Sequence, residues 1–260
     1  MPEIPNTEYT SDEMMAVAAA RRLADKTVCF VGIGLPSVAA NLARATHAPN
    51  IVLIYESGTI GAKPRVLPLS IGDSELANTA DTIVPTHEIF RYWLQSGRID
   101  VGFLGAAQID RYANLNTTVI GDYATPKVRL PGAGGAPEIA SHAREVIVVM
   151  KHSPRGFVSK LDFVTSAGFL SGGTHRTRIH APGAGPQAVI TNLGILEPHP
   201  ESRELTLTWI HPGVRVEDVR NATGWPIRMS AELNTTLKPT PFELEALRDL
   251  KARTTAAHET

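Results

Sequence analysis

Short apolar runs recur along this chain of 260 residues, and a turn that contains glycine follows each of them. The clearest runs are 28–31, 51–55 and 101–104. A strand that is apolar at nearly every position is typical of a parallel sheet with both faces covered. Helical patterns lie between the runs, which gives an alternation of strand, helix and strand. The sequence therefore predicts an α/β fold, with an open, mostly parallel sheet and helices on both faces.

The flanking residues give the expected element boundaries. Thr10 and Glu13 form a capping pattern before an apolar helical stripe, and Pro36 suits the first turn of a helix over about 37–45. Thr86 caps a further helix that Gly97 ends. No repeat or low-complexity segment divides the chain, so we expect a single domain over 1–260. Further strands are expected at 117–120, 145–150, 187–191 and 204–210, with a last helix from about 241.

Composition excludes several classes of protein. Lys and Arg number 25 against 26 Asp and Glu, so there is no basic excess for nucleic acid or an anionic membrane. A single cysteine, Cys29, excludes a disulfide scaffold. The first residues are acidic and polar, unlike a signal peptide, and no apolar stretch has membrane length. We expect a cytoplasmic protein with neither a nucleic-acid nor a membrane partner.

The first candidate site is the turn of Gly32 and Gly34 between a strand and a helix. Such turns present backbone N–H groups at a helix N-terminus and bind dinucleotides in some folds. Ser37 stands where that fingerprint has its third glycine, and no ribose-binding acid follows the next strand. The pattern favours an ordinary tight turn over a nucleotide site.

The second candidate is Glu56, directly after the run 51–55 and before Gly58. The carboxyl ends of strands line the ligand crevice of an open α/β sheet, so this carboxylate is expected to face a substrate. A strand-end glutamate also serves as a helix cap or a salt-bridge partner, and both interpretations stay open.

The third candidate is the glycine-rich stretch 131–137, which contains Gly134, Gly135 and Ala136. Successive glycines expose backbone N–H groups that can stabilise an oxyanion or a phosphate, although the same composition suits a flexible turn. Gln108 lies in a fourth candidate, a strand-end loop rich in amides that either fix a substrate or cap turns. The nine histidines show no metal-ligand spacing, so we expect no metal site, and no serine or cysteine lies in a nucleophile-elbow motif.

Taken together, these stretches resemble the β subunit of family I CoA-transferases, and within them the glutaconate CoA-transferase branch. Many relatives have Ser-Glu-Asn-Gly at the catalytic acid, whereas 55–58 here reads Tyr-Glu-Ser-Gly, similar to the glutaconate branch. The matching stretches run almost the whole chain, at 31–36, 55–58, 103–110, 120–123 and 132–136, with a C-terminal motif at 211–219 followed by 223–224.

The resemblance implies a mechanism and a partner. Glu56 would attack an acyl-CoA thioester and then carry CoA as a glutamyl-CoA thioester before passing it to a carboxylic acid, with backbone N–H groups of Gly135 and Ala136 as the oxyanion donors. Gly32, Gly34 and Gln108 are weaker candidates for the substrate or CoA loops. Coenzyme A would be a substrate, with no permanently bound cofactor. A separately encoded α subunit would complete the site in a hetero-oligomer such as α2β2.

Other functions remain open. Relatives of this branch include decarboxylases and C–C bond hydrolases that act on CoA thioesters, although the transferase glutamate tends to be replaced in those. The same architecture could also serve as a non-catalytic ligand-sensing module. A dicarboxylate such as glutaconate would require an arginine or hydroxyl cluster near the acyl end, and Arg65, Arg98 and Arg129 are available. The aperiodic segment 153–186 is expected to form part of the subunit interface or to cover CoA.

Overall fold

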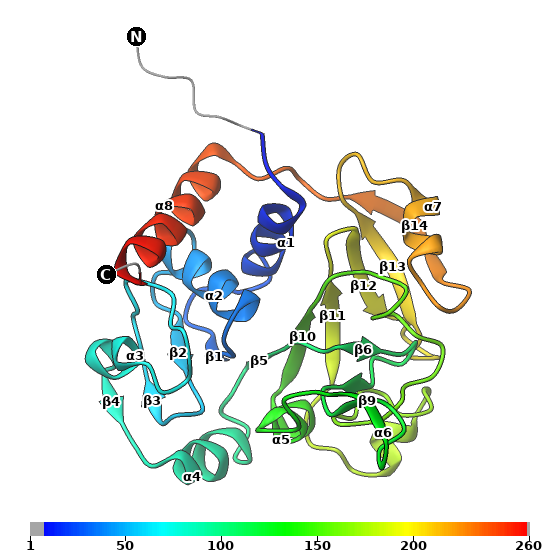
Figure 1. Cartoon of the computed structure of the whole chain (residues 1–260), viewed down its shortest axis with the longest axis horizontal. Helices are drawn as coiled ribbons and strands as arrows, with labels where there is room; N and C mark the ends of the chain where they lie inside the picture. Colours follow the sequence, from blue (N-terminus) through cyan, green and yellow to red (C-terminus); the bar gives the residue numbers. More distant parts are fainter. Residues whose placement is uncertain (1–7, 259–260) are drawn as a thin grey trace.

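The computed structural model describes residues 8–258. Ten strands form one mixed sheet in the order β14-β13-β12-β11-β10-β5-β1-β2-β3-β4 (Figure 1). The five consecutive strands from β11 to β2 are parallel to one another, as the apolar runs predict. The ten strands of the main sheet are β1 (Val28–Phe30), β2 (Val52–Ile54), β3 (Thr59–Ile60), β4 (Thr82–Ile83), β5 (Val101–Leu104), β10 (Glu145–Val149), β11 (Pro186–Ile190), β12 (Gly194–Pro198), β13 (Leu205–Ile210) and β14 (Arg228–Thr235).

Helices cover both faces of this sheet, which confirms the expected architecture. Alternate strand residues belong to two separate apolar cores, with Cys29 and Leu53 in one and Phe30 and Ile54 in the other. The helices α1, α2 and α8 pack together over the first core (Figure 1), whereas η1 and α5 contribute to the second. The helices are α1 (Ser11–Ala20), α2 (Leu35–Ala45), α3 (Ser74–Thr79), α4 (Thr86–Glu88), the π-helix η1 (Ile89–Leu94), α5 (Ala136–His142), α6 (His175–Arg178), α7 (Val216–Asn221) and α8 (Pro241–His258).

The predicted helix starts are found close to their expected positions. Thr10 caps α1 through a capping box in which its hydroxyl accepts from the Glu13 N–H, while the Glu13 carboxylate accepts from the Thr10 N–H. Gly34 precedes α2 and Pro36 lies in its first turn. The helix predicted after Thr86 continues from α4 into η1, and Gly97 follows it with a φ of +73°.

The structure differs from the expected strands at several points. The strand predicted at 117–120 is β8 (Val119–Gly121), which pairs with β9 (Pro126–Arg129) in a separate hairpin instead of entering the main sheet. A second hairpin joins β6 (Gln108–Ile109) to β7 (Leu115–Asn116). Three unpredicted strands at the two ends of the main sheet are short or polar: β3 and β4 have two residues each, and β14 is largely exposed. Their sequences lack the apolar runs that predicted the central strands.

The segment 153–186 folds back onto the body of the molecule. Isolated bridges pair Phe157 with Ile109 and Ser166 with Leu115. The buried guanidinium of Arg176 donates to the carbonyl oxygens of Ala140 (2.7 Å), Gly183 (2.9 Å) and Gly168 (3.0 Å). The segment is therefore joined both to the β6–β7 hairpin and to the end of α5.

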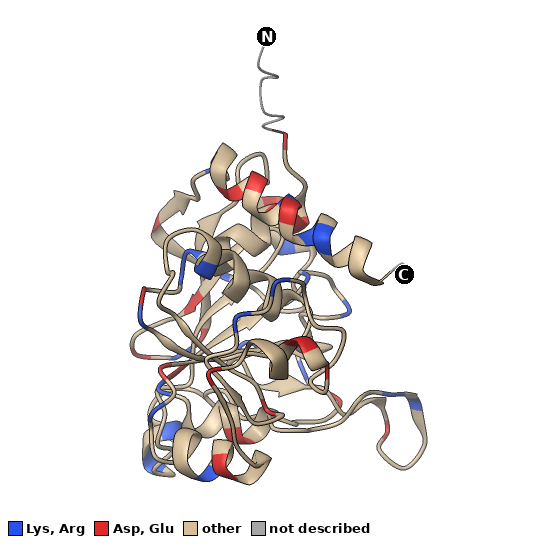
Figure 2. Ribbon diagram, turned by 90° about the vertical axis from the view of Figure 1, so that its left-hand side faces the viewer, with Lys and Arg blue, Asp and Glu red and all other residues tan. Residues whose placement is uncertain are grey.

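In the ribbon of Figure 2, segments with Lys or Arg are interspersed with segments that carry Asp or Glu. Within residues 8–258, no helix combines the length and the apolar character that crossing a membrane requires.

Candidate active site

Glu56 lies at the carboxyl end of β2, in a tight turn that leads into β3. The turn is closed by a hydrogen bond from the Gly58 N–H to the Tyr55 carbonyl (3.0 Å), and Gly58 has a φ of +107°. A Cβ at Gly58 would lie only 1.9 Å from the carbonyl oxygen of Val84, so no other residue fits without moving the backbone. The glycine that follows Glu56 therefore fixes the turn that presents its carboxylate.

The carboxylate of Glu56 has no hydrogen-bond or ion-pair partner among residues 8–258. It is half-buried and does not cap a helix. A structural glutamate at a strand end would be expected to hold a cation or a backbone N–H. The structural interpretation of Glu56 is therefore not supported by its contacts, and the carboxylate is available to a ligand.

The glycine-rich stretch forms an open loop, residues 131–135, before α5. Gly132 and Gly134 have positive φ angles of +101° and +48°. Neither the Gly134 N–H nor the Gly135 N–H donates a hydrogen bond to any described residue, whereas the Ala136 N–H donates to the Ala133 carbonyl (3.0 Å). The sequence assigned Gly135 and Ala136 as the donor pair, but in this structure Gly134 and Gly135 are the pair with unpartnered N–H groups.

Glu56 and the glycine loop meet across the site. A Cβ built on Gly135 would lie 3.4 Å from Oε2 of Glu56 and 2.7 Å from Cζ of Phe90. The Phe90 ring in turn lies against Phe30, with the ring centroids 5.8 Å apart. Only glycine fits at position 135 without moving the Phe90 ring, because the carboxylate and the aromatic ring both approach its backbone closely.

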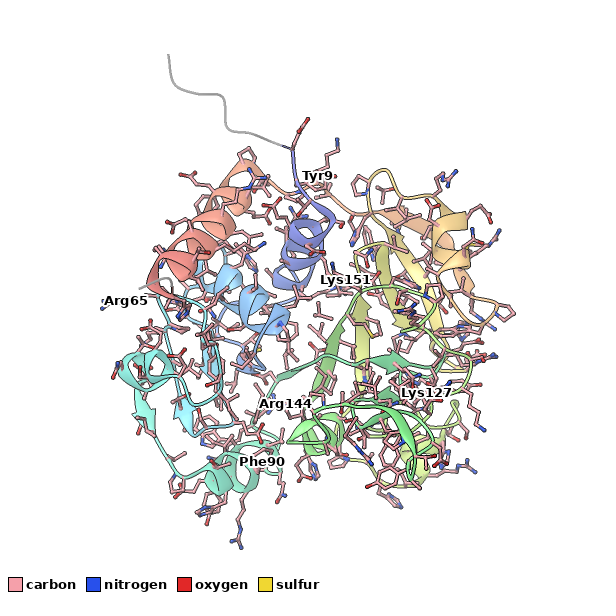
Figure 3. All side chains as sticks on the ribbon, viewed as in Figure 1. Tyr9, Arg65, Phe90, Lys127, Arg144 and Lys151 are labelled. Atoms are coloured by element: carbon pink, nitrogen blue, oxygen red, sulfur yellow. The ribbon has the colours of Figure 1, made fainter. Side chains whose placement is uncertain are left out.

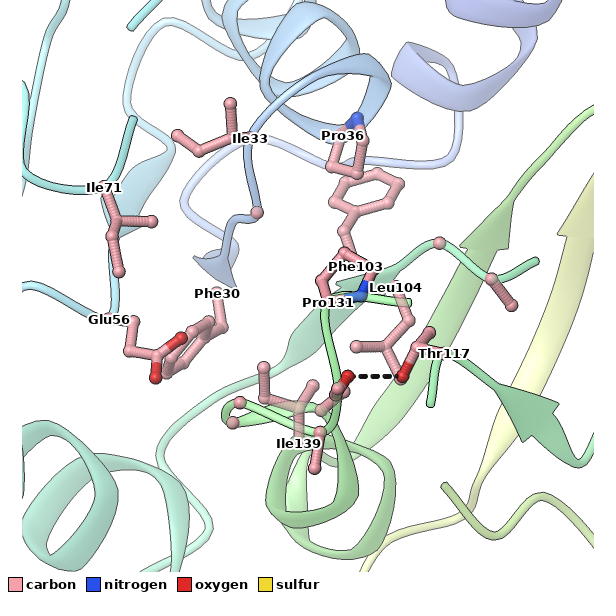
Figure 4. A pocket seen from close by; sticks show the side chains of 18 of the residues that line it. Phe30, Ile33, Pro36, Glu56, Ile71, Phe103, Leu104, Thr117, Pro131 and Ile139 are labelled. Atoms are coloured by element: carbon pink, nitrogen blue, oxygen red, sulfur yellow. Dashed lines mark hydrogen bonds between the residues drawn. The ribbon is translucent and has the colours of Figure 1, made fainter. Parts of the chain in front are cut away.

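These groups border a pocket of about 480 Å³ (Figure 4). Phe30 lies beside the Glu56 carboxylate in this view, with Ile139 on the opposite wall. Glu56 is the one ionisable side chain among the described residues that line the pocket, so its charge faces mainly apolar groups and backbone. The lining residues are Phe30, Val31, Gly32, Ile33, Pro36, Glu56, Ile71, Phe103, Leu104, Gly105, Ala106, Ala107, Thr117, Leu130, Pro131, Gly132, Ala133, Gly134, Gly135, Ala136 and Ile139.

The three weaker candidate residues, Gly32, Gly34 and Gln108, do not lie together in the structure. Gly32 lines the pocket, but Gly34 does not; it stands at the start of α2 with a φ of +81°. Gln108 is buried outside the pocket, where its amide donates to Asp162 (2.9 Å) and accepts from Asn116 (2.7 Å). Both functional groups of Gln108 are thus committed to the fold, which does not support a direct contact with substrate.

None of the three arginines considered for a dicarboxylate lines the pocket. Arg65 lies near the C-terminal half of α8, far from Phe90 (Figure 3), and its carbonyl accepts from Arg253. Arg98 is exposed. Arg129 in β9 donates to the Tyr123 carbonyl (3.2 Å) and lies over the Tyr123 ring, 5.0 Å from its centroid. The pocket wall built by residues 8–258 therefore carries no cation for a second carboxylate.

The sequence did not indicate three residues of this site. Phe30 and Phe90 belong to apolar patterns that predict core positions, and only the strand-end position of Phe30 could have suggested the crevice. Thr117 lies in the strand predicted at 117–120, yet its side chain lines the pocket beside the glycine loop (Figure 4). Among the described residues no group of three or more His, Cys, Asp or Glu is arranged to hold a metal ion.

The fold is that of a CoA-transferase, and the chain belongs to the coenzyme A transferase family, whose model matches residues 12–222. It is 66% identical over 250 residues to a subunit of the 3-oxoadipate CoA-transferase of Pseudomonas knackmussii, with 96% of each chain covered. It is 36% identical to a subunit of the glutaconate CoA-transferase of Acidaminococcus fermentans, over 94% of this chain and 92% of that one.

A solved structure agrees with these sequence relatives. The crystal structure of glutaconate CoA-transferase from Acidaminococcus fermentans matches with a TM-score of 0.87 at 35% identity, over 93% of this chain and 94% of the matched chain. The family resemblance and the fold class inferred from the sequence are thus confirmed. The glutaconate enzyme, whose branch the sequence indicates, is a more distant match than the 3-oxoadipate enzyme, with 36% against 66% identity.

Proposed function

We propose that this chain is the nucleophile-bearing subunit of an enzyme that transfers CoA between an acyl-CoA and a carboxylic acid. One observation carries this proposal. The unpartnered carboxylate of Glu56 lies close to Gly135 of the glycine loop, and the N–H groups of Gly134 and Gly135 are also unpartnered, in a largely apolar pocket. Such a site brings together a nucleophile and donors for the negative charge that develops on the thioester oxygen.

The reaction follows from these groups. The Glu56 carboxylate attacks the thioester carbonyl, the C–S bond breaks, and an acyl-glutamyl anhydride and a CoA thiolate form. The thiolate attacks the glutamyl carbonyl of the anhydride, which releases the first carboxylate and leaves a glutamyl-CoA thioester. The acceptor carboxylate then repeats these steps in reverse, so the glutamate is regenerated and no oxidant or metal is needed.

The pocket favours the difficult first step. A carboxylate in water is a weak nucleophile toward a thioester, but here apolar side chains replace part of its hydration. The N–H groups of Gly134 and Gly135 are assigned to the tetrahedral oxyanion, and each such donor is typically worth about 3–4 kcal/mol of transition-state stabilisation. Binding of the large CoA body away from the reacting atoms supplies energy that orients the thioester.

For the substrate we propose a 3-oxo dicarboxylic acid of the size of 3-oxoadipate. Support comes from the 66% identity to a 3-oxoadipate CoA-transferase subunit, against 36% for the glutaconate enzyme. A dicarboxylate leaves one carboxylate to be bound away from Glu56, and the pocket wall formed by the described residues offers no cation for it. We assign that recognition to a second chain.

We propose a separately encoded α subunit as that second chain, in a hetero-oligomer such as α2β2. The relatives at 66% and 36% identity are each named as one subunit of their enzyme, which implies a further subunit in both. Apolar groups such as Ile71, which is 41% exposed and lines the pocket, are left for a partner to cover. Coenzyme A enters as a substrate, and no permanently bound cofactor is required by the chemistry.

Decarboxylation and C–C bond hydrolysis on the same fold are less favoured, because the glutamate is present and both relatives above are named as transferases. Product analysis separates the reactions. With the proposed α subunit co-expressed, transfer requires an acceptor acid, whereas decarboxylation releases carbon dioxide without one. A ligand-sensing role would show binding by calorimetry and no turnover with any acid.

The direct test is chemical trapping of the intermediate. The complex is incubated with an acyl-CoA and then with borohydride, which reduces a glutamyl thioester to the hydroxyl, and the modified peptide is mapped by mass spectrometry. We expect reduction at Glu56 that depends on acyl-CoA and disappears in Glu56→Gln. Turnover with no modification at Glu56, or with modification at another residue, would rule out this mechanism.

The substrate class has a separate test. Acceptor acids of similar length are compared with one acyl-CoA donor, such as succinyl-CoA: 3-oxoadipate, glutaconate and a monocarboxylic 3-oxo acid. We expect the highest kcat/KM with 3-oxoadipate. A preference for glutaconate or for the monocarboxylate would overturn the proposed substrate and leave the trapping experiment unaffected.

A further inference from the structure

We propose that Thr117 is a positioning residue, whose hydroxyl fixes the glycine loop so that the N–H groups of Gly134 and Gly135 point toward Glu56. This inference rests on the proposed function, because it concerns the donors of the proposed transfer reaction. Thr117 lies just after β7 and lines the pocket on the side of the loop (Figure 4).

Two hydrogen bonds hold Gly132 to Thr117. The Gly132 N–H donates to the Thr117 carbonyl (2.9 Å), and the Thr117 hydroxyl donates to the Gly132 carbonyl (2.7 Å), the bond drawn in Figure 4. The side-chain bond therefore acts on the peptide group that leads directly toward Gly134. Because the hydroxyl proton is committed to this carbonyl, Thr117 is suited to orienting the loop rather than to donating to substrate.

The loop needs such a restraint. Gly132 and Gly134 have positive φ angles, and a Cβ on either would meet no atom within 4 Å, so packing does not hold their backbone. Among the described residues, Thr117 provides the hydrogen bonds that reach 131–134 from outside the loop and α5. The backbone of glycine can adopt many conformations, and an N–H group stabilises an oxyanion only when it points at the oxygen. The Thr117 hydroxyl thus limits the freedom of the two donors.

Thr117 is itself held by the segment 153–186. Its N–H donates to the Thr165 hydroxyl (2.9 Å), and the Thr165 N–H donates to the Leu115 carbonyl (2.8 Å). The Thr118 hydroxyl also bonds to that of Thr165 (2.7 Å). A chain of hydrogen bonds therefore runs from this segment through Thr117 to the glycine loop.

The test uses three variants of the complex with its α subunit. Thr117→Val removes the hydroxyl and keeps the shape, and Thr117→Ser restores the hydroxyl. Thr208→Val is the matched control, because its hydroxyl also donates to a backbone carbonyl, that of Ile195 (3.3 Å), but outside the pocket. We expect kcat to fall about 10- to 100-fold in Thr117→Val, with the KM for acyl-CoA within about threefold of wild type. Thr117→Ser should recover most of kcat, and Thr208→Val should stay within about threefold of wild type.

A second measurement does not depend on activity. Hydrogen exchange of the peptide that contains 131–135 should become faster in Thr117→Val and remain near wild type in Thr208→Val. The inference is overturned if Thr117→Val and Thr208→Val behave alike in both measurements, if Thr117→Ser fails to recover kcat, or if the loss appears in KM alone. A wild-type complex without transfer activity would contradict the proposed function instead, while the exchange result would still report on the restraint.

Discussion

Two groups of polar residues lie in different regions of the molecule, and they differ in whether their polar atoms have hydrogen-bond partners. In the pocket, the Glu56 carboxylate after β2 and the N–H groups of Gly134 and Gly135 ahead of α5 have no hydrogen-bond partner among residues 8–258. After β10 and β13, by contrast, both ring nitrogens of His152 and His211 are bonded, to Thr223, Thr191 and Thr236. We refer to these two histidines and their partners as the histidine cluster.

The difference reflects what each region does. The histidine cluster is closed, with His152 and His211 6% and 2% exposed, and the His152 ring stacks on Phe157 with centroids 3.7 Å apart. Its polar groups satisfy one another and stabilise the fold. The pocket leaves polar groups without partners, which costs stability and makes them available to a ligand. We expect substitutions in the pocket to change activity with little effect on stability, and those in the cluster to do the opposite.

The largest expected effect is that of Glu56→Gln. Loss of the nucleophile should lower kcat by about a thousandfold or more, as expected when a covalent catalyst is removed. The melting temperature should stay the same, because the carboxylate has no partner to lose among residues 8–258. Steady-state kinetics and thermal unfolding check both parts, with Glu201→Gln on the exposed surface as a control. A large drop in melting temperature would show that Glu56 stabilises the fold, and would contradict the expected difference between the pocket and the histidine cluster.

Gly135→Ala should have the next largest effect, a loss of about a hundredfold in kcat. The new Cβ would lie 2.7 Å from the Phe90 ring, so either the ring or the loop that carries the donor must move, beside the Glu56 carboxylate whose Oε2 lies 3.4 Å from that Cβ. Combining Gly135→Ala with Phe90→Leu removes the ring that the new Cβ would meet. We expect the double variant to recover part of the activity. Additive losses in the double-mutant cycle would show that Phe90 does not transmit the effect.

Acid should destabilise the histidine cluster. Burial lowers the pKa of His152 to about 3, below its usual 6.5, and lowers the pKa of His211 as well. Between these values the unfolded chain binds a proton that the folded chain excludes, so stability is lost as pH falls below about 6.5. For His152 alone the loss between pH 7 and pH 5 is about 2 kcal/mol.

Urea unfolding at a series of pH values measures this loss. The slope of stability against pH should flatten in His152→Gln and remain in His87→Gln, a change to an exposed histidine. An unchanged slope in His152→Gln would show that His152 does not govern acid stability.

Cys29→Ala should have the smallest effect, about 1 kcal/mol of stability and no change in kcat. Cys29 is fully buried and does not line the pocket, and burial raises the pKa of its thiol. Iodoacetamide should therefore label the folded chain slowly and the unfolded chain rapidly. Rapid labelling of the folded chain, or inactivation by it, would show that the core around β1 opens in the folded state and would contradict this prediction.

Much of the fold could be predicted from local patterns. The apolar runs of β1, β2 and β5 and the helix starts near Thr10 and Thr86 indicate elements because backbone geometry and burial act within a few residues. The strands β12 and β14 were missed because neither contains a long apolar run: β12 has only Ile195 and Leu196 before Glu197, and β14 is largely exposed. The segment 117–120 has the composition of a sheet strand, yet β8 pairs with β9 in a hairpin of its own.

The sequence by itself determined that a glutamate follows a buried strand, that a glycine-rich loop precedes a helix, and that their order matches the CoA-transferase family. The tertiary structure decided that Glu56 and Gly135 meet, that the Ala136 N–H is already bonded, that Gln108 is held away from the pocket and that Thr117 lines it. Residue type and spacing fix which groups stand at the ends of elements. Which of those groups remain unpartnered depends on contacts made across the whole sheet.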